Sequence, residues 1–100
     1  MPISAEIEAD LPFLTALRRD LHAHPELGFE EVRTSDIVAK LLDEAGIKVH
    51  RGLGGTGVVG TLQLGNGTRT IGLRADMDAL AMPEIADRPY KSTVPGKMHA

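Results

Sequence analysis

The feature that most restricts the fold of this chain is a change in the spacing of its apolar residues at Gly57. Before this glycine, apolar residues recur every three or four positions, as in amphipathic helices; after it they recur about every two, as in strands. The segments "GVVGTLQL" and "RTIGLRAD" flank "GNGT", whose Asn66-Gly67 pair favours a tight hairpin turn. The sequence therefore predicts helices followed by two antiparallel strands, at 58–64 and 70–75.

A first helix is predicted over residues 11–23. Asp10 is expected to be its N-cap, Pro12 falls in the first turn, and Pro25 ends the helix because the residue before proline avoids helical angles. Its expected inward-facing residues recur at helical spacing: Leu14, Leu17 and Leu21.

A second helix is predicted over residues 30–45. Glu30 and Glu31 stand where the helix dipole favours negative charge, and Gly46 is the expected C-terminal cap. The expected buried stripe consists of Ile37, Val38, Leu41, Leu42 and Ala45. The residues that follow, 47–51, are predicted to form a short strand.

The ends of the chain have no regular pattern. Residues 1–10 are expected to be a lead-in, residues 11–75 to carry the helices and strands, and residues 76–100, rich in proline, to be a long loop of the active-site kind. The predicted fold class is α/β, with two helices, a strand and a β-hairpin in a sheet that is incomplete.

Composition restricts the function more weakly. The 100 residues suit one small domain or a piece of a larger one, and 42% are apolar, which is enough for a core. The net charge of −3 argues against a nucleic-acid surface. The sequence contains no window apolar enough for a membrane span and no secretory signal at its start, so a cytoplasmic location is expected, with no membrane partner.

The stretch "GLGGTG", Gly52 to Gly57, matches the G-x-G-x-x-G dinucleotide fingerprint. That fingerprint requires a helix after its last glycine, whose N-terminus holds the pyrophosphate. Here Val58 and Val59 follow, and both favour a strand. A turn between strands is therefore predicted, and a nucleotide-binding protein is retained only as an alternative function.

Histidines and acids gather in "LHAHPELGFEE", residues 21–31. His22 and His24 are two positions apart across a helix end, whereas metal ligands on one helix face need a spacing of three or four. The pattern favours a structural role, in which histidines suit a helix C-terminus and acids suit the next N-terminus. Metal ligation remains the competing interpretation.

Two carboxylates, Asp76 and Asp78, end the last predicted strand. Residues two apart on a strand point to the same side, and open α/β sheets place ligands at such strand ends. Two neighbouring carboxylates repel unless a cation lies between them, so the pair indicates a metal or a charged partner such as Arg74. The alternative is a solvated strand exit in which Asp78 caps a short turn.

Four segments in this order and spacing resemble the N-terminal part of a known family: "RRDLHAHPELGFEE", "GVVGTLQL", "LRADMDALAMPE" and "GKMHA". The family is that of hippurate hydrolase, the N-acyl-amino-acid aminoacylases and the plant hydrolases of auxin conjugates, within the wider group of dinuclear metallopeptidases. The resemblance covers nearly the whole chain from about Leu14.

The resemblance implies a metal-dependent amidohydrolase that cleaves the amide bond of an N-acyl amino acid. It implies a catalytic domain with a separate lid and dimerisation domain, which is expected to be absent from this chain, and a homo-oligomeric parent protein. It also implies two divalent metal ions, zinc or manganese, that activate a water molecule. In the family, "MHA" runs into Cys-Gly-His-Asp, whose cysteine and histidine bind metal, and the general-base glutamate lies further on. The chain is therefore expected to be inactive alone and to bind zinc weakly.

For single residues, the resemblance assigns Asp78 the role of orienting a metal ligand without touching the metal. Asp76 occupies the position of a metal-binding histidine, which makes it a candidate ligand. His22, His24, Pro25 and Glu26 match a signature with an architectural role, and His99 is placed near the site but not as a ligand. A non-catalytic α/β binding module is the alternative to the enzyme.

Overall fold

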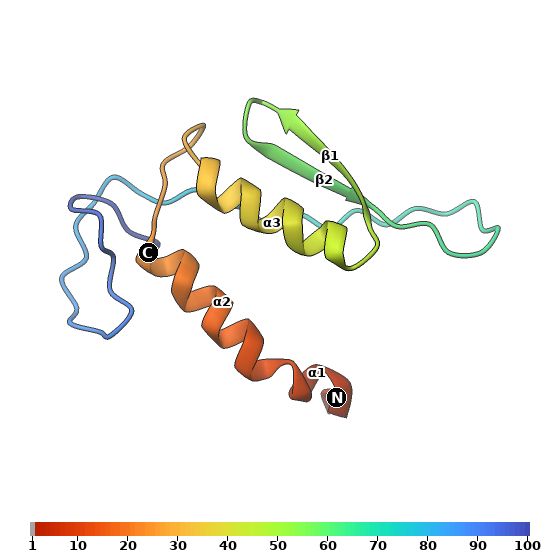
Figure 1. The fold of residues 1–100 in the computed structure, drawn as a ribbon, viewed down its shortest axis with the longest axis horizontal. Coiled ribbons are helices and arrows are strands. Elements are labelled where there is room, and N and C mark those ends of the chain that lie inside the picture. Colours follow the sequence, from red (N-terminus) through yellow and green to blue (C-terminus); the bar gives the residue numbers. More distant parts are fainter. Residues whose placement is uncertain (1) are drawn as a thin grey trace. The chain divides into compact units, whose positions relative to one another are not determined.

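The computed structural model describes residues 2–100 (Figure 1). It contains three helices, α1 (Ala5–Ala9), α2 (Leu11–Ala23) and α3 (Val32–Glu44), and two strands, β1 (Lys48–Leu53) and β2 (Gly57–Thr61). The chain divides into two compact units. The discontinuous unit combines the stretch up to Pro25 with residues 79–100, and the continuous unit runs from Glu26 to Asp78.

In the continuous unit, α3 packs on an antiparallel hairpin formed by β1 and β2 (Figure 1). Lys48 pairs with Thr61 and His50 with Val59, and the register shifts between Arg51 and Leu53. The turn between the strands is the glycine-rich stretch, where Gly54 and Gly55 take φ values of +62° and +94° that other residues rarely adopt. The prediction of a turn at this stretch is confirmed, because β2 and not a helix follows it.

Close packing of α3 on the hairpin depends on Gly60. A Cβ atom at this position would lie 2.9 Å from Ile47 Cγ2 and 3.3 Å from Leu42 Cδ1, so the absent side chain lets both apolar groups approach the strand. The helix ends at Glu44, and Gly46, the glycine predicted to cap it, follows two residues later with a φ of +77°. Of the predicted stripe, Ala45 is exposed and the other members are half-buried, whereas the buried residues of α3 are Thr34, Ser35 and Ala39.

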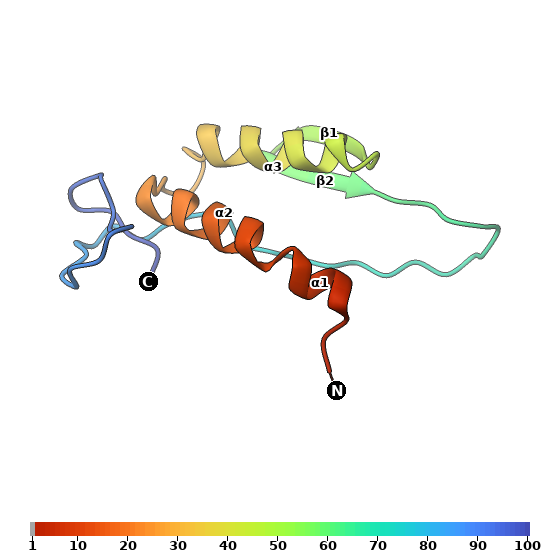
Figure 2. The same ribbon diagram turned by 60° about the horizontal axis from the view of Figure 1, so that its bottom comes forward.

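The predicted hairpin at Asn66-Gly67 is wrong. A two-residue type I′ turn needs positive φ at both of its central residues, but here the positive φ, +68°, falls at Gly65. Residues 62–78 instead run as an extended excursion without strand pairing (Figure 2). Ile71 is 86% exposed and Leu73 is 96% exposed, so the apolar residues of the predicted second strand cover nothing within the continuous unit.

The discontinuous unit begins with two successive helices. The short helix α1 lies within the segment expected to be a lead-in, and the Ser4 hydroxyl accepts a bond from the Ile7 amide at 3.4 Å. Asp10 occupies the predicted N-cap position of α2, but its angles are nearly helical and its side chain forms no cap hydrogen bond. The backbone is therefore already close to helical at Asp10, before α2 begins. Leu17 and Leu21 are half-buried, whereas Leu14 is 44% exposed.

Residues 79–100 contain no helix and no regular strand, as the sequence predicts. Leu80 and Met98 form an isolated antiparallel bridge, with N–O distances of 2.8 and 3.0 Å, which closes the intervening residues into a loop. Thr93 joins this loop to α2: its amide and its hydroxyl both donate to the Ala23 carbonyl, at 2.8 and 2.7 Å. Within residues 2–100, no helix has the length and apolar character needed to cross a membrane.

Candidate functional site

Asp76 lies at the end of the extended excursion, in an exposed position. Its carboxylate accepts a hydrogen bond from the Arg74 guanidinium at 3.1 Å, and the two side chains are 70% and 84% exposed. The charged partner expected from the sequence is therefore present. A pair this exposed contributes little to stability, because water screens it.

Asp78 is also exposed, but its side chain lies near Gly28, whereas that of Asp76 is paired with Arg74. Its Oδ2 atom lies 3.7 Å from the position that a Cβ on Gly28 would take, so it approaches the loop between α2 and α3. That loop is tied to the glycine-rich turn by a hydrogen bond from Thr56 Oγ1 to Glu31 Oε2, at 2.9 Å. Phe29 stands in the same loop with φ of +67°, and its Cε1 atom lies 3.8 Å from the corresponding Cβ position of Gly54.

The two aspartates do not make a metal centre by themselves. Within residues 2–100, no group of three or more His, Cys, Asp or Glu side chains is arranged to hold a metal ion. A structural divalent-metal site usually needs about four ligands. The side chains described here therefore do not fit a dinuclear centre without further ligands.

Glu26 is the residue that holds the start of α3. Its two carboxylate oxygens accept hydrogen bonds from the backbone amides of Arg33 and Thr34, at 2.9 and 2.6 Å. Burial raises the pKa of Glu26, but the hydrogen bonds from Thr34 and Arg33 outweigh it, so the pKa lies below its usual value. Carboxylates at this helix start were expected at Glu30 and Glu31; the capping group comes instead from Glu26, in the loop before the helix.

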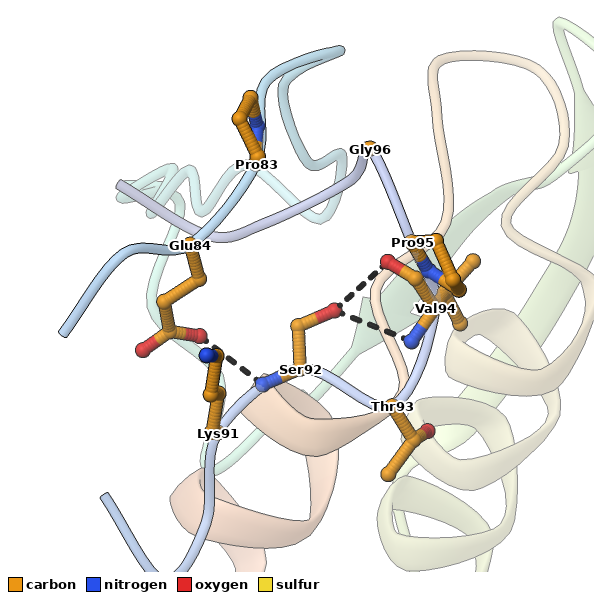
Figure 3. A pocket seen from close by; sticks show the side chains of 8 residues that line it. All are labelled: Pro83, Glu84, Lys91, Ser92, Thr93, Val94, Pro95 and Gly96. Carbon is orange, nitrogen blue, oxygen red and sulfur yellow. Dashed lines mark hydrogen bonds between the residues drawn. The ribbon is translucent and has the colours of Figure 1, made fainter. Parts of the chain in front are cut away.

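A second buried carboxylate, Glu84, binds the end of α2 to the loop of residues 80–98. Its oxygens lie 2.9 and 3.1 Å from His22 Nε2, and its Oε1 accepts a bond from the Ser92 amide at 2.9 Å (Figure 3). The Ser92 amide, followed by His22, lowers the pKa of Glu84 below its usual value. Sequence reasoning missed this residue, although a glutamate inside the mostly apolar "ALAMPE" was a signal for a buried carboxylate.

The contacts of the two histidines support their structural interpretation. His24 Nδ1 lies 2.8 Å from the Asp20 carbonyl oxygen, which is one of the last carbonyls of α2. His22 faces Glu84, and its ring packs edge-on against Tyr90 at 5.6 Å between centroids. The His99 ring lies 6.3 Å from that of His22, and the Arg19 guanidinium covers the Tyr90 ring at 4.6 Å.

A small cavity of about 300 Å³ lies beside Glu84 in the loop of residues 80–98 (Figure 3). Its walls come from one continuous part of the discontinuous unit: Pro83, Glu84, Lys91, Ser92, Thr93, Val94, Pro95 and Gly96. The Glu84 carboxylate in its wall is already hydrogen-bonded to His22 and to the Ser92 amide. The cavity therefore results from the hydrogen bonds that hold this loop together.

Comparison with known proteins places this arrangement among hydrolases. No family model matches the chain. The hippurate hydrolase of Campylobacter jejuni is 50% identical over 84 residues, which are 84% of this chain and 22% of that protein. An IAA-amino acid hydrolase of Arabidopsis thaliana is 47% identical over 88 residues, 88% of this chain and 20% of that protein.

The folds agree as well. The crystal structure of the YXEP protein of Bacillus subtilis, described as a dinuclear metal binding peptidase from the M20 family, matches with a TM-score of 0.85 and 38% identity. The match covers 92% of this chain and 26% of that one. The chain is therefore similar, over nearly its whole length, to the N-terminal part of this group of amidohydrolases and metallopeptidases.

These matches confirm two predictions: the resemblance itself, and the α/β fold of the N-terminal part of a dinuclear-metallopeptidase catalytic domain. The chain spans about a fifth to a quarter of the length of the relatives that it matches. The roles of Asp76 and Asp78 stay predictions, because similarity in sequence and fold does not by itself assign a role to a single residue.

Proposed function

We propose that the protein carrying this sequence is a metal-dependent amidohydrolase that cleaves the amide bond of N-acyl amino acids. The relatives are named for two such activities, on hippurate and on IAA–amino acid conjugates, and the structural relative is a dinuclear metal binding peptidase. Residues 1–100 are proposed to contribute part of the catalytic domain, with residues 76–100 as an active-site loop. Alone they are proposed to be inactive.

The observation that carries the proposal is the position of the match with hippurate hydrolase. A continuous stretch of 84 residues in a chain of 100 includes residues 17–84, so the 50% identity spans the loop between α2 and α3, the glycine-rich turn, and both aspartates. The close approach of Asp78 to Gly28 adds a structural reason, because a side chain on Gly28 would point toward the carboxylate.

We assign Asp78 a positioning role and Asp76 the role of a candidate metal ligand. The Asp78 carboxylate is exposed and lies beside Gly28, which has no side chain to cover it. It can therefore accept a hydrogen bond from a metal-bound imidazole and so fix the orientation of that ring. Two divalent ions, zinc or manganese, are proposed to be held with further ligands beyond Ala100. The bound ions supply the Lewis acidity that amide hydrolysis needs.

The test uses the protein as it is encoded, including any residues that follow Ala100. After removal of metals with a chelator, zinc or manganese is restored and the release of glycine from hippurate is measured, with acetyl and indoleacetyl amino acids and a dipeptide as competing substrates. Hydrolysis of the N-acyl amino acids is expected with at least one of the two metals. Cleavage of the dipeptide alone would refute the proposed substrate class.

Asp78→Asn is expected to lower kcat/KM about 10- to 100-fold, the usual effect of losing the group that orients a metal ligand. Asp87→Asn is the matched control, since Asp87 is an exposed aspartate on the same 76–100 stretch. Equal kcat/KM values in Asp78→Asn and Asp87→Asn would show that Asp78 has no role in the active site. For residues 1–100 alone, tight stoichiometric zinc binding that is lost in Asp76→Ala would contradict the expected weak binding.

The remaining features of the proposal are broader. The substrate is proposed to be a small molecule rather than a nucleic acid or a membrane, and the location to be cytoplasmic. The nucleotide-binding alternative lacks its structural requirement, because β2 follows the glycine-rich turn where a helix would be needed.

A further inference from the structure

In the discontinuous unit, a side-chain contact joins His22 to Glu84, and these two residues are 62 positions apart in the sequence. Both side chains are shielded from water, at 13% and 4% exposure. A buried carboxylate is stable only when its oxygens are hydrogen-bonded, so this contact restricts where residues 80–98 can lie.

The Glu84 carboxylate connects three points of the chain. Because an ionised carboxylate only accepts hydrogen bonds, His22 Nε2 must carry the proton that it shares with the two oxygens, at 2.9 and 3.1 Å. Oε1 also accepts from the Ser92 amide. The end of α2, the beginning of the loop and its far side therefore meet at a single carboxylate.

Ser92 extends this connection toward the end of the loop. Its hydroxyl oxygen accepts a bond from the Val94 amide at 3.2 Å (Figure 3). The same hydroxyl donates to the Lys97 carbonyl oxygen at 2.7 Å. Lys97 precedes Met98, which bridges back to Leu80. A continuous series of hydrogen bonds therefore leads from Glu84 to the point at which the two ends of the loop meet.

We propose that Glu84 is a positioning residue: through His22 and Ser92 it fixes the path of residues 92–98, and thereby the direction in which the chain leaves the Leu80–Met98 bridge at His99 and Ala100. Leu80 is two positions after Asp78 in the sequence. In its consequence for catalysis, this inference rests on the proposed function. The restriction of the loop itself does not.

The first arm of the test measures hydrogen exchange in the encoded protein, in peptides that cover residues 90–98. Glu84→Ala is expected to speed exchange there about tenfold, since it leaves the Ser92 amide and His22 without their acceptor. Glu84→Gln keeps an acceptor oxygen and is expected to give about a two- to threefold increase. Asp87→Ala, in the same loop, is the control and is expected to leave exchange unchanged. Unchanged exchange in Glu84→Ala would overturn the inference whatever the activity.

A second pair of variants tests the other side of the contact. His22→Gln keeps an N–H donor and is expected to restore most of the protection that His22→Leu loses. Equal loss of protection in both would show that the ring's bulk, rather than its hydrogen bond to Glu84, holds the loop. If Glu84→Ala does not fold, Glu84→Gln and the His22 pair decide the question by themselves.

The second arm measures kcat and KM on an N-acyl amino acid. We expect kcat to fall most in the variants whose exchange is fastest, with KM changed less than twofold. The reason is that a displaced loop would misplace catalytic groups without removing substrate contacts. Faster exchange with unchanged kcat would overturn the positioning role. A wild-type protein without hydrolase activity would refute the proposed function, and the exchange arm would still decide whether Glu84 restricts the loop.

Discussion

The two units of the molecule hold their loops in opposite ways. In the continuous unit, α3 packs on the β1–β2 hairpin that follows it directly, and Glu26 caps α3 from seven and eight positions away. In the discontinuous unit, no residue of α2 is fully buried, and the loop of residues 80–98 is joined to α2 by hydrogen bonds between residues 62 and 70 positions apart. The same device, a glutamate at a helix end, works locally in one unit and at long range in the other.

This difference matters for how each unit responds to a substitution. Contacts between neighbours in sequence form at a low entropic cost, whereas closing a long loop must be offset by the contacts made at its ends. We therefore expect the continuous unit to depend on its backbone geometry and the discontinuous unit to depend on a few polar contacts.

The largest expected effect is that of Gly57→Ala. A Cβ at Gly57 would lie much closer to the Leu53 carbonyl oxygen than the sum of the two van der Waals radii allows, at the irregular pair that closes the hairpin. Because a backbone atom cannot move aside without opening the turn, we expect a loss of about 3 kcal/mol in the free energy of unfolding. Hydrogen exchange in β1 and β2 measures it.

Gly67→Ala is the matched control. Nothing lies within 4 Å of the Cβ position at Gly67, and its φ is not in the positive range that hinders other residues. The variant is expected to be neutral within about 0.5 kcal/mol. If it destabilised the protein as much as Gly57→Ala, the hairpin would lie at Asn66-Gly67 after all.

These two glycines show what could be predicted of the fold. The helices α2 and α3 were predicted to within about two residues, since their apolar spacing, Pro12 and Gly46 are local signals, whereas α1 was not predicted. The Asn66-Gly67 pair is as strong a local signal, but residues 70–75 form no strand, because no other strand pairs with them in the structure. The sequence alone does not show which edge a segment will pair with. Local patterns predicted the elements, and tertiary pairing decided which segments became strands.

The next effect is that of Glu26→Ala, which removes the acceptor for two amides at the start of α3. Hydrogen bonds to a charged group are among the stronger ones, so we expect the continuous unit to lose about 2 kcal/mol. Glu44→Ala is the control: Glu44 is exposed and forms only a 3.9 Å pair with Lys40. A loss no larger than that of the control would show that water replaces the Glu26 carboxylate.

Acid should weaken both units for the same reason. The folded pKa values of Glu26 and Glu84 lie below their unfolded values. Each carboxylate therefore stabilises the fold above its unfolded pKa, and this contribution is lost as the pH falls below the usual pKa of a glutamate and through the lower folded value. In Glu26→Ala, exchange in α3 should lose this part of its pH dependence while exchange in residues 90–98 keeps it.

The candidate site was predicted unevenly. Asp76 and Asp78 stand out in the sequence because two acids interrupt an apolar run, and the Arg74 partner lies two positions away. The sequence marks the positions of Glu26 and Glu84, as part of a signature and as an acid in an apolar stretch, but not their partners, which are backbone amides and a histidine that only the fold brings near. A motif shows where chemistry is concentrated in a sequence, but not which carboxylates the tertiary structure will bury.

The smallest expected effect is that of Thr93→Val in the discontinuous unit. The variant removes the hydroxyl that donates to the Ala23 carbonyl at 2.7 Å, but it keeps the backbone amide that donates to the same oxygen at 2.8 Å. Because Thr93 is exposed and a second donor remains, we expect a loss of about 0.5 kcal/mol, seen as slightly faster exchange in residues 90–98. Thr68→Val, at an exposed position of the excursion, controls for the change of side chain. A loss in Thr93→Val as large as that in Glu26→Ala would show that the Thr93 amide does not compensate for the lost hydroxyl, and that this single side-chain contact holds the loop to α2.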